Sequence, residues 1–255
     1  MDELAKQYTP NSLSLTSLFD NYLFRALMGE KELLDHKMDI FSLARLDADC
    51  LRLLRNMIYA RRGMRFSSRD LSGYFGKFSW YKGNTGNVDK LLTETDKYNI
   101  SLIQAFERRN EGIANTNWGN DRIGMWQDYW MVASGYTARF LIYQNNKMEY
   151  FTSQMDGMKL LNGLSGTYSI KGNVLTFIVS RIEYYTHDND IEDDPIMGLT
   201  YSNIKSNTIT LSTPLVFKFP VSAINAPKGN DKPPYQFIVI GGVEHYRVSS
   251  DPNSN

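Results

Sequence analysis

The spacing of apolar residues changes near the middle of the chain, and this change constrains the fold more than any other feature. Up to Arg109, apolar side chains recur at intervals of three and four residues, which is typical of helices. After Asn120 they alternate every second residue, which is typical of strands. The sequence therefore predicts an α+β protein, with a small helical domain followed by an antiparallel β-barrel or half-barrel.

A polar segment rich in Gly and Asn separates the two patterns. We expect a helical domain over residues 1–112 with its core at 47–107, a linker at 113–120, a β-barrel-like domain at 121–250 and a tail at 251–255. The chain of 255 residues, 42% of them hydrophobic, is long enough for two such cores. Its formal net charge is zero, so nothing attracts the whole molecule to nucleic acid, and no nucleic-acid partner is expected.

Local signals place three helices in the first half. Asp47 is a favourable N-cap, and Gly63 suits the left-handed residue that follows a helix. The spacing of Ser67 and Asp70 predicts a capping box for a second helix, and Thr93 with Asp96 predicts one for a third. The apolar faces expected to pack together are Leu51, Leu54 and Ile58 in the first helix and Ile100, Ile103 and Phe106 in the third.

Residues 51–107 resemble the YARHG family, small helical modules of bacterial proteins that lie outside the cytoplasm. The residues that carry the resemblance are Leu54-Arg55-Asn56, Ile58-Tyr59-Ala60-Arg61, Gly63, Phe66, Leu71, Tyr74-Phe75, Trp80-Tyr81, Leu92-Thr93 and Asn99-Ile100. Arg62 stands where the family has histidine, which argues against a role for a titrating imidazole there. The resemblance implies an extracytoplasmic module and supplies no catalytic mechanism.

The second half shows hairpin signals. The turn Lys171-Gly172-Asn173 lies between two strand-like runs, and Gly241-Gly242 lies between the last two. Several short strands at this spacing predict an antiparallel sheet that curls on itself. The pattern over residues 166–176 resembles lipocalin-like β-barrels of bacterial envelope proteins.

An arginine-rich stretch is the first candidate binding surface, and two interpretations of it remain open. As a docking surface it would use arginine forks, which bind carboxylates and phosphates, together with aromatic rings. As a structural feature, Arg55 and Arg61 would point inward to carbonyl groups and stack on Trp80 or Tyr81, and the aromatic residues would build the core. The residues of the hypothetical surface are Tyr59, Arg61, Arg62, Arg65, Arg69, Trp80 and Tyr81.

Metal and cofactor signals are sparse. The three histidines show no zinc-binding spacing, and a single cysteine excludes a cysteine-rich zinc site. The acidic segment 187–194 offers carboxylates of the type that calcium prefers, namely Asp188, Asp190, Asp193 and Asp194. It lacks the EF-hand pattern, so we interpret it as a solvated loop. We expect no cofactor and identify no catalytic residue, because no nucleotide-binding or nucleophile motif occurs.

These features favour a non-catalytic protein of the bacterial cell envelope, whose helical module docks on an envelope polymer or a partner protein. Two alternatives remain open: a carrier that holds a small apolar ligand in the barrel, and a hydrolase assembled from distant carboxylates. No apolar run approaches the roughly 20 residues that span a bilayer. We expect an extracytoplasmic location, in the periplasm or as a surface lipoprotein, if an export signal has been removed, and a cytoplasmic one otherwise.

Overall fold

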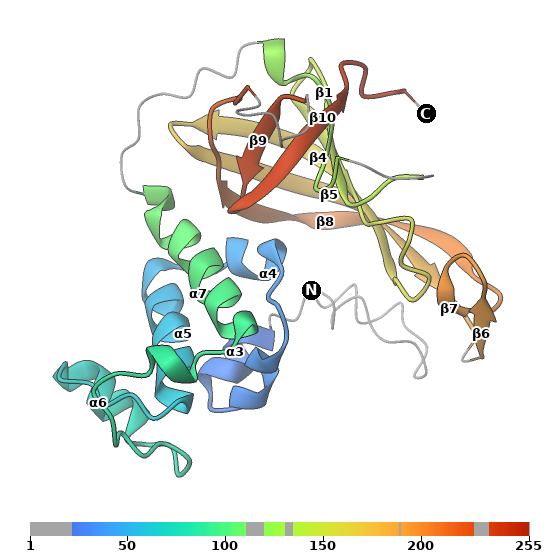
Figure 1. Ribbon diagram of the computed structural model, residues 1–255. Coiled ribbons are helices and arrows are strands. Elements are labelled where there is room, and N and C mark those ends of the chain that lie inside the picture. The colour runs from blue at the N-terminus through green and yellow to red at the C-terminus, as the bar shows by residue number, and fades with distance from the viewer. Residues whose placement is uncertain (1–21, 111–119, 131–134, 189, 227–234, 255) are drawn as a thin grey trace. The chain divides into compact units, whose positions relative to one another are not determined.

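The computed structural model describes residues 22–110, 120–130, 135–188, 190–226 and 235–254 (Figure 1). The chain contains two compact units, a helical unit within Asp20–Glu111 and a sheet unit within Gly112–Asn255. The fold class is α+β, as predicted. Most of the predicted linker lies outside the described residues, so the domain boundaries stay predictions. None of the described helices is long and apolar enough to span a membrane.

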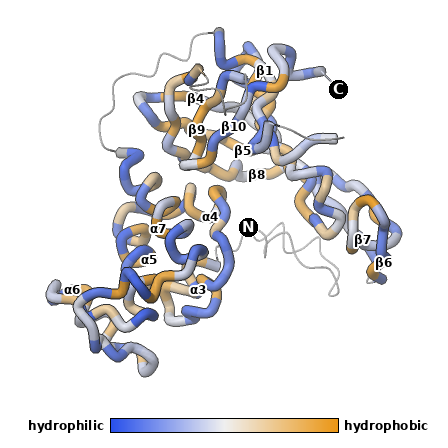
Figure 2. Tube along the Cα trace, in the orientation of Figure 1, coloured by the Kyte–Doolittle hydropathy of each residue, from blue (hydrophilic) through white to orange (hydrophobic). Residues whose placement is uncertain are grey.

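Short helices precede and flank two longer ones in the helical unit. The longer pair, α5 and α7, pack against each other around a core of apolar side chains that are fully buried. In Figure 2 hydrophobic stretches run along both helices. The helices, including the short 3-10 turns marked η, are α3 (Tyr22–Leu27), η1 (Lys31–Asp35), α4 (Ile40–Ala44), α5 (Ala48–Arg61), α6 (Arg69–Phe75), η2 (Asp89–Leu91), α7 (Glu94–Glu107) and η3 (Arg108–Asn110).

The predicted boundaries of α5 are confirmed. Asp47 caps its start, because the carboxylate accepts a hydrogen bond of 2.8 Å from the backbone N–H of Cys50. Gly63 follows its end with φ +90°, a conformation that glycine adopts without strain. The predicted stripe is buried at Leu51, Leu54 and Ile58.

The two predicted capping boxes have different outcomes. At α7 the box is present, with Thr93 and Asp96 each bonded to the other's backbone N–H. At α6 the prediction is wrong: the N-cap is Ser68 rather than Ser67, and its side chain makes no capping bond. Ser68 Oγ donates to the carboxylate of Asp70 instead, because an exposed side chain in the first turn competes for that hydroxyl.

Eight antiparallel strands form the sheet, in the order β8-β5-β4-β3-β2-β1-β10-β9. Both predicted turns are present, with Gly172, Gly241 and Gly242 at positive φ. The strands are β1 (Gly124–Gln127), β2 (Arg139–Ile142), β3 (Lys147–Phe151), β4 (Leu161–Lys171), β5 (Val174–Thr186), β8 (Lys205–Pro220), β9 (Phe237–Ile240) and β10 (Val243–Ser249).

The sheet curls strongly around an aromatic interior. The ring of Phe140 on β2 lies 6.2 Å from that of Phe219 on β8, although three strands separate β2 from β8 in the sheet. The segment after β8 meets β9 at isolated bridges between Val221 and Ile240 and between Asn225 and Phe237. The strand ladders do not close into a barrel, so the closed form of the prediction is wrong and the curled, open form stands.

The sheet unit buries several large aromatic side chains. Trp126, Phe140, Phe177, Phe217 and Phe219 are all fully buried.

A two-stranded arm projects from the sheet between β5 and β8, formed by β6 (Ile191–Asp194) and β7 (Gly198–Tyr201). The acidic segment that the sequence presents as a solvated loop therefore contains a strand. Acidic residues are poor strand formers, and β6 forms because β7 supplies a partner in antiparallel register.

Candidate functional site

The carboxylate of Asp96 lies at the centre of the YARHG-like signature. It is 0% exposed and binds two arginines, Arg61 through Nη2 and Arg62 through Nε at 2.8 Å and Nη2 at 2.7 Å. The backbone N–H of Thr93 donates to the same carboxylate at 2.9 Å. Burial raises the pKa of Asp96, but the hydrogen bonds from Arg61 and Thr93 outweigh it, so the pKa lies below its ordinary value.

Arg61 connects three segments of the helical unit. Besides Asp96 on α7, its guanidinium donates to the carbonyl groups of Lys31 and Leu34 at 3.0 Å each, and to Asp35 Oδ1 at 2.8 Å. The prediction that Arg61 points inward to carbonyl groups is confirmed. Its described contacts include neither the ring of Trp80 nor that of Tyr81, so Arg61 holds the fold together through carboxylates and carbonyls.

Other arginines of the cluster are also paired. Arg55 donates from Nε to Glu107 on α7 at 2.9 Å, so it binds a carboxylate at the surface of the helix pair instead of interior carbonyls. Arg52 binds Asp70 on α6 at 2.7 Å. These pairs attach α5 to its neighbours.

The predicted aromatic residues pack inside a lobe formed by residues 64–92. Trp80 stacks on Phe78 with ring centroids 5.2 Å apart, and its Nε1–H donates to the carbonyl of Gly29 at 3.1 Å. The Tyr81 hydroxyl donates to the carbonyl of Met64 at 2.9 Å. Tyr59 on α5 is half-buried. The Trp80 and Tyr81 rings are therefore half-buried and held in place by these contacts.

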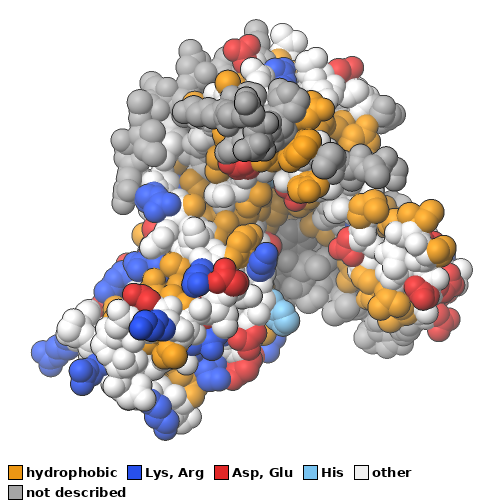
Figure 3. All heavy atoms as spheres, in the orientation of Figure 1, with side chains coloured by type: hydrophobic (Ala, Val, Ile, Leu, Met, Phe, Trp, Pro, Cys, Tyr) orange, Lys and Arg blue, Asp and Glu red, His pale blue; other side chains and the backbone are white. Residues whose placement is uncertain are grey.

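None of the five basic side chains on the lobe has an ion-pair partner among the described residues. All five are exposed, and the four that precede Gly83 are Arg65, Arg69, Lys77 and Lys82. Residues 64–92 contain five basic residues and two acidic ones, Asp70 and Asp89, and Asp70 is already bound by Arg52. Figure 3 shows Lys and Arg side chains at the edge of the part that Figure 1 labels α6. We call these four residues the basic lobe.

Carboxylates of the acidic segment accept hydrogen bonds from nearby N–H groups. Asp194 Oδ1 accepts from the backbone N–H groups of Ile196 and Met197 at 2.7 Å each, and Asp188 accepts from the side-chain amide of Asn203 at 2.6 Å. Within the described part of the chain, no three acidic, His or Cys side chains gather in a way that could hold a metal ion. The calcium interpretation of Asp188, Asp190, Asp193 and Asp194 gains no support from this geometry.

Two buried polar side chains in the sheet unit, Glu149 and His245, are bonded to neighbouring residues. Glu149 accepts from Lys147 Nζ at 2.8 Å and from the Tyr143 hydroxyl at 2.8 Å. His245 is fully buried, and this burial lowers its pKa to about 4 although its ring bonds the carbonyl of Val243. These contacts stabilise the sheet unit.

Sequence reasoning missed the second role of Asp96 and the role of Asn99. Asn99, one turn along α7, accepts from the backbone N–H of Met38 and donates to the carbonyl of His36, both at 2.9 Å. Buried Arg109 likewise donates to the carbonyl of Leu46. A polar residue on the apolar side of a predicted helix was the available signal, because such a residue needs a partner once it is buried.

The extent of the matching domain family agrees with the contacts described above. No curated protein sequence and no solved structure matches the chain. A domain family does match, and its match begins at Ala26 instead of Leu51. It therefore includes the end of α3 and the whole of η1 and α4, and Arg61 is bonded directly to η1. Residues 26–108 of the chain form a YARHG domain.

Proposed function

We propose that the protein is a non-catalytic component of the bacterial cell envelope, and that its YARHG domain docks through the basic lobe on an anionic envelope polymer or partner protein. YARHG domains occur in extracytoplasmic proteins, which supports this setting. The observation that carries the proposal is the contrast within one arginine-rich stretch. Arg52, Arg55, Arg61 and Arg62 are bound to carboxylates, whereas the four cations of the basic lobe are exposed without a described counter-ion.

The lobe is suited to docking because its cations are mounted on a rigid base. Phe66 stacks on Phe75 and on Tyr81, with ring centroids 5.1 Å and 6.2 Å apart. Gly83 lies against the Tyr81 ring, where a larger residue would collide with it. A packed aromatic core reduces the conformational freedom that the exposed side chains lose on binding.

The partner is expected to carry carboxylates or phosphates. Guanidinium groups bind both in a bidentate manner, and lysine ammonium groups add unspecific attraction. Because the cations are exposed, added salt should weaken the interaction.

Co-sedimentation with purified cell-wall sacculi and pull-down from envelope extract test the proposal. The variant Arg65→Glu with Arg69→Glu should bind at least about tenfold more weakly, since two attractive contacts become repulsive. The matched control is Lys171→Glu with Lys205→Glu, which makes the same charge change at exposed positions of the sheet unit. Equal binding by the two double variants would refute the basic lobe as the docking surface. Arg62→Glu is a poor test, because it places a second carboxylate beside buried Asp96.

A further inference from the structure

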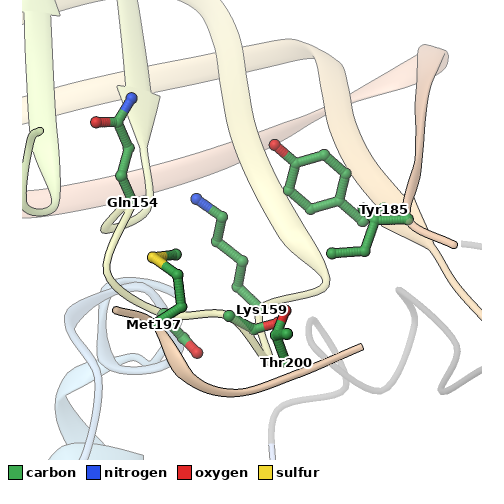
Figure 4. A pocket seen from close by; sticks show the side chains of 8 residues that line it. Gln154, Lys159, Tyr185, Met197 and Thr200 are labelled. Atoms are coloured by element: carbon green, nitrogen blue, oxygen red, sulfur yellow. The ribbon is translucent and has the colours of Figure 1, made fainter. Parts of the chain in front are cut away.

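A pocket of about 370 Å³ lies where the loop after β3 meets the β6–β7 arm, away from the aromatic interior of the sheet. Figure 4 shows Lys159 in its middle, with the ammonium group directed between Gln154 and Tyr185, and with Met197 and Thr200 below. The residues that line it are Gln154, Asp156, Gly157, Lys159, Tyr185, Met197, Thr200 and Ile204.

The arm is fastened to the loop at Gly157. Its carbonyl accepts from Thr200 Oγ1 at 3.1 Å and from the backbone N–H of Tyr201 at 3.4 Å. A Cβ atom on Gly157 would lie 2.9 Å from the carbonyl oxygen of Leu199 and 2.9 Å from Thr200 Cβ. Glycine therefore permits the close approach that turns two surface segments into one concave site.

Lys159 supplies positive charge that no described ion pair neutralises. Its ammonium donates to the carbonyl of Ser153 at 2.9 Å, which uses one of its three hydrogens, and no described carboxylate pairs with it. Burial lowers the pKa of Lys159; the charge of Asp156 opposes this effect and that of Arg139 adds to it. Asp156, the carboxylate in the lining, accepts from the backbone N–H of Met158 at 3.1 Å.

Arg139 lies close enough to Lys159 to affect its charge and is itself incompletely bonded. Its guanidinium rests over the rings of Tyr136 and Phe151, at 4.7 Å and 5.1 Å from their centroids. Its Nη1 is buried and has no hydrogen-bond partner among the described residues. Two half-buried cations without a described carboxylate partner form a region of positive potential.

Further donors and an apolar wall complete the pocket. Gln154 accepts from the backbone N–H of Tyr136 through Oε1 at 2.9 Å, which fixes the amide and leaves its NH₂ group available. The Tyr185 hydroxyl donates to Asn162 at 3.0 Å, which holds the ring at the side of the pocket. Met197 and Ile204 add apolar surface to the lining.

We propose that this pocket binds small carboxylates in which the carboxylate adjoins an apolar group of moderate size. The carboxylate would accept from Lys159 Nζ and the Gln154 amide, and the apolar group would lie against Met197, Ile204 and the Tyr185 ring. Such a group can belong to a free aliphatic acid or to the C-terminal residue of a peptide. This site lies in the sheet unit and is independent of the docking proposed for the basic lobe.

Met197 provides the readout, because its side chain lines the pocket. The protein is labelled at the methionine methyl groups with ¹³C, and the Met197 signal is assigned by its loss in Met197→Leu. The full chain is titrated to about 10 mM with hexanoate and with a peptide that ends in a free leucine carboxylate. A saturable shift of the Met197 signal is expected, and whichever of the two titrants produces it identifies the source of the carboxylate.

Two controls separate specific binding from a general effect. Hexanamide and the amidated peptide should shift the signal much less, because they lack the charge that Lys159 recognises. Lys159→Met should weaken binding by about tenfold or more, the usual effect of a lost charge-assisted hydrogen bond, while exposed Lys171→Met should not change it. The proposal is overturned if neither acid shifts the signal, if the amides act as well as the acids, or if Lys159→Met binds as the parent protein does.

Discussion

Arg61 and Asp96 form an ion pair inside the YARHG domain, with side chains that are 5% and 0% exposed. Arg62 binds the other oxygen of the same carboxylate, and the N-cap residue Thr93 binds it through its backbone N–H. One carboxylate thus joins the end of α5 to the beginning of α7. The most distinctive arginines of the signature therefore stabilise the domain, whereas the basic side chains of the lobe after Gly63 are exposed and have no ion-pair partner among the described residues.

Asp96→Ala should lower the free energy of unfolding by about 3–5 kcal/mol, the usual cost of removing one partner from a buried charge pair. Two guanidinium groups would remain in place without their carboxylate. Urea unfolding followed by circular dichroism measures the loss. Asp35→Ala is the control, since Asp35 also binds Arg61 but is 59% exposed, and it should cost less than about 1 kcal/mol. Similar losses in both variants would mean that Asp96 has no special role.

Arg62→His should destabilise the domain less than Arg62→Ala. The Nε2 atom of histidine lies as many bonds from Cα as the Nε atom of arginine, which binds Asp96 at 2.8 Å. An imidazole can therefore donate to the same oxygen, whereas alanine leaves that oxygen with one partner fewer. We expect a loss of about 1–2 kcal/mol for alanine and clearly less for histidine. Unfolding free energies of the two variants, measured below pH 6.5 so that the imidazole is charged, provide the comparison. Equal losses would show that the imidazole does not replace this contact.

The helical domain could be predicted well because its signals are local. Asp47, Gly63 and the Thr93–Asp96 box each fix a helix end through contacts within a few residues. The capping box, however, predicts only the bonds between Asp96 and Thr93, and not the main role of Asp96, which is to bind two arginines. Its contacts with Arg61 and Arg62 cross more than thirty positions of sequence, and spacing carries no information on such pairs.

The sheet was predictable in class and less so in detail, because strand pairing is set by distant partners. The Gly172 turn gave the β4–β5 hairpin, but the strands continue far beyond it, to Leu161 and Thr186, since β8 pairs with the whole of β5. The acidic segment became β6 only through its pairing with β7. The pocket around Lys159 was not foreseen, as its residues come from four separate segments.

His245 should make the protein less stable in acid. The folded chain takes up a proton at His245 only near pH 4, because the ring is buried, whereas the unfolded chain does so at about pH 6.5. Between these values the unfolded state binds more protons, so stability falls as the pH falls, by at most about 1.4 kcal/mol per pH unit. Below pH 4 this contribution no longer changes.

The difference between the parent protein and His245→Leu isolates this effect from that of the carboxylates. Urea unfolding from pH 7 to pH 4 should show a smaller loss of stability in the variant, by about 3 kcal/mol across the window. His36 is exposed, and His36→Gln should behave as the parent protein does. Parallel curves for the parent protein and His245→Leu would contradict the buried, neutral state of this ring.

Gly166→Ala should destabilise the sheet unit by about 3 kcal/mol or more, because there is no room for a side chain at this position. A Cβ atom there would lie 1.9 Å from the carbonyl oxygen of Ile178 and 2.9 Å from Val179 Cα, both backbone atoms that cannot turn aside. The register of β4 against β5 shifts next to Gly166, so the close approach belongs to a bulge. Gly172→Ala is the comparison: no atom lies within 4 Å of its Cβ position, and only the positive φ of +60° opposes alanine, at about 1 kcal/mol. Thermal and urea unfolding of both variants would rank them, and a loss at Gly166 no greater than at Gly172 would show that β5 can move to admit a methyl group.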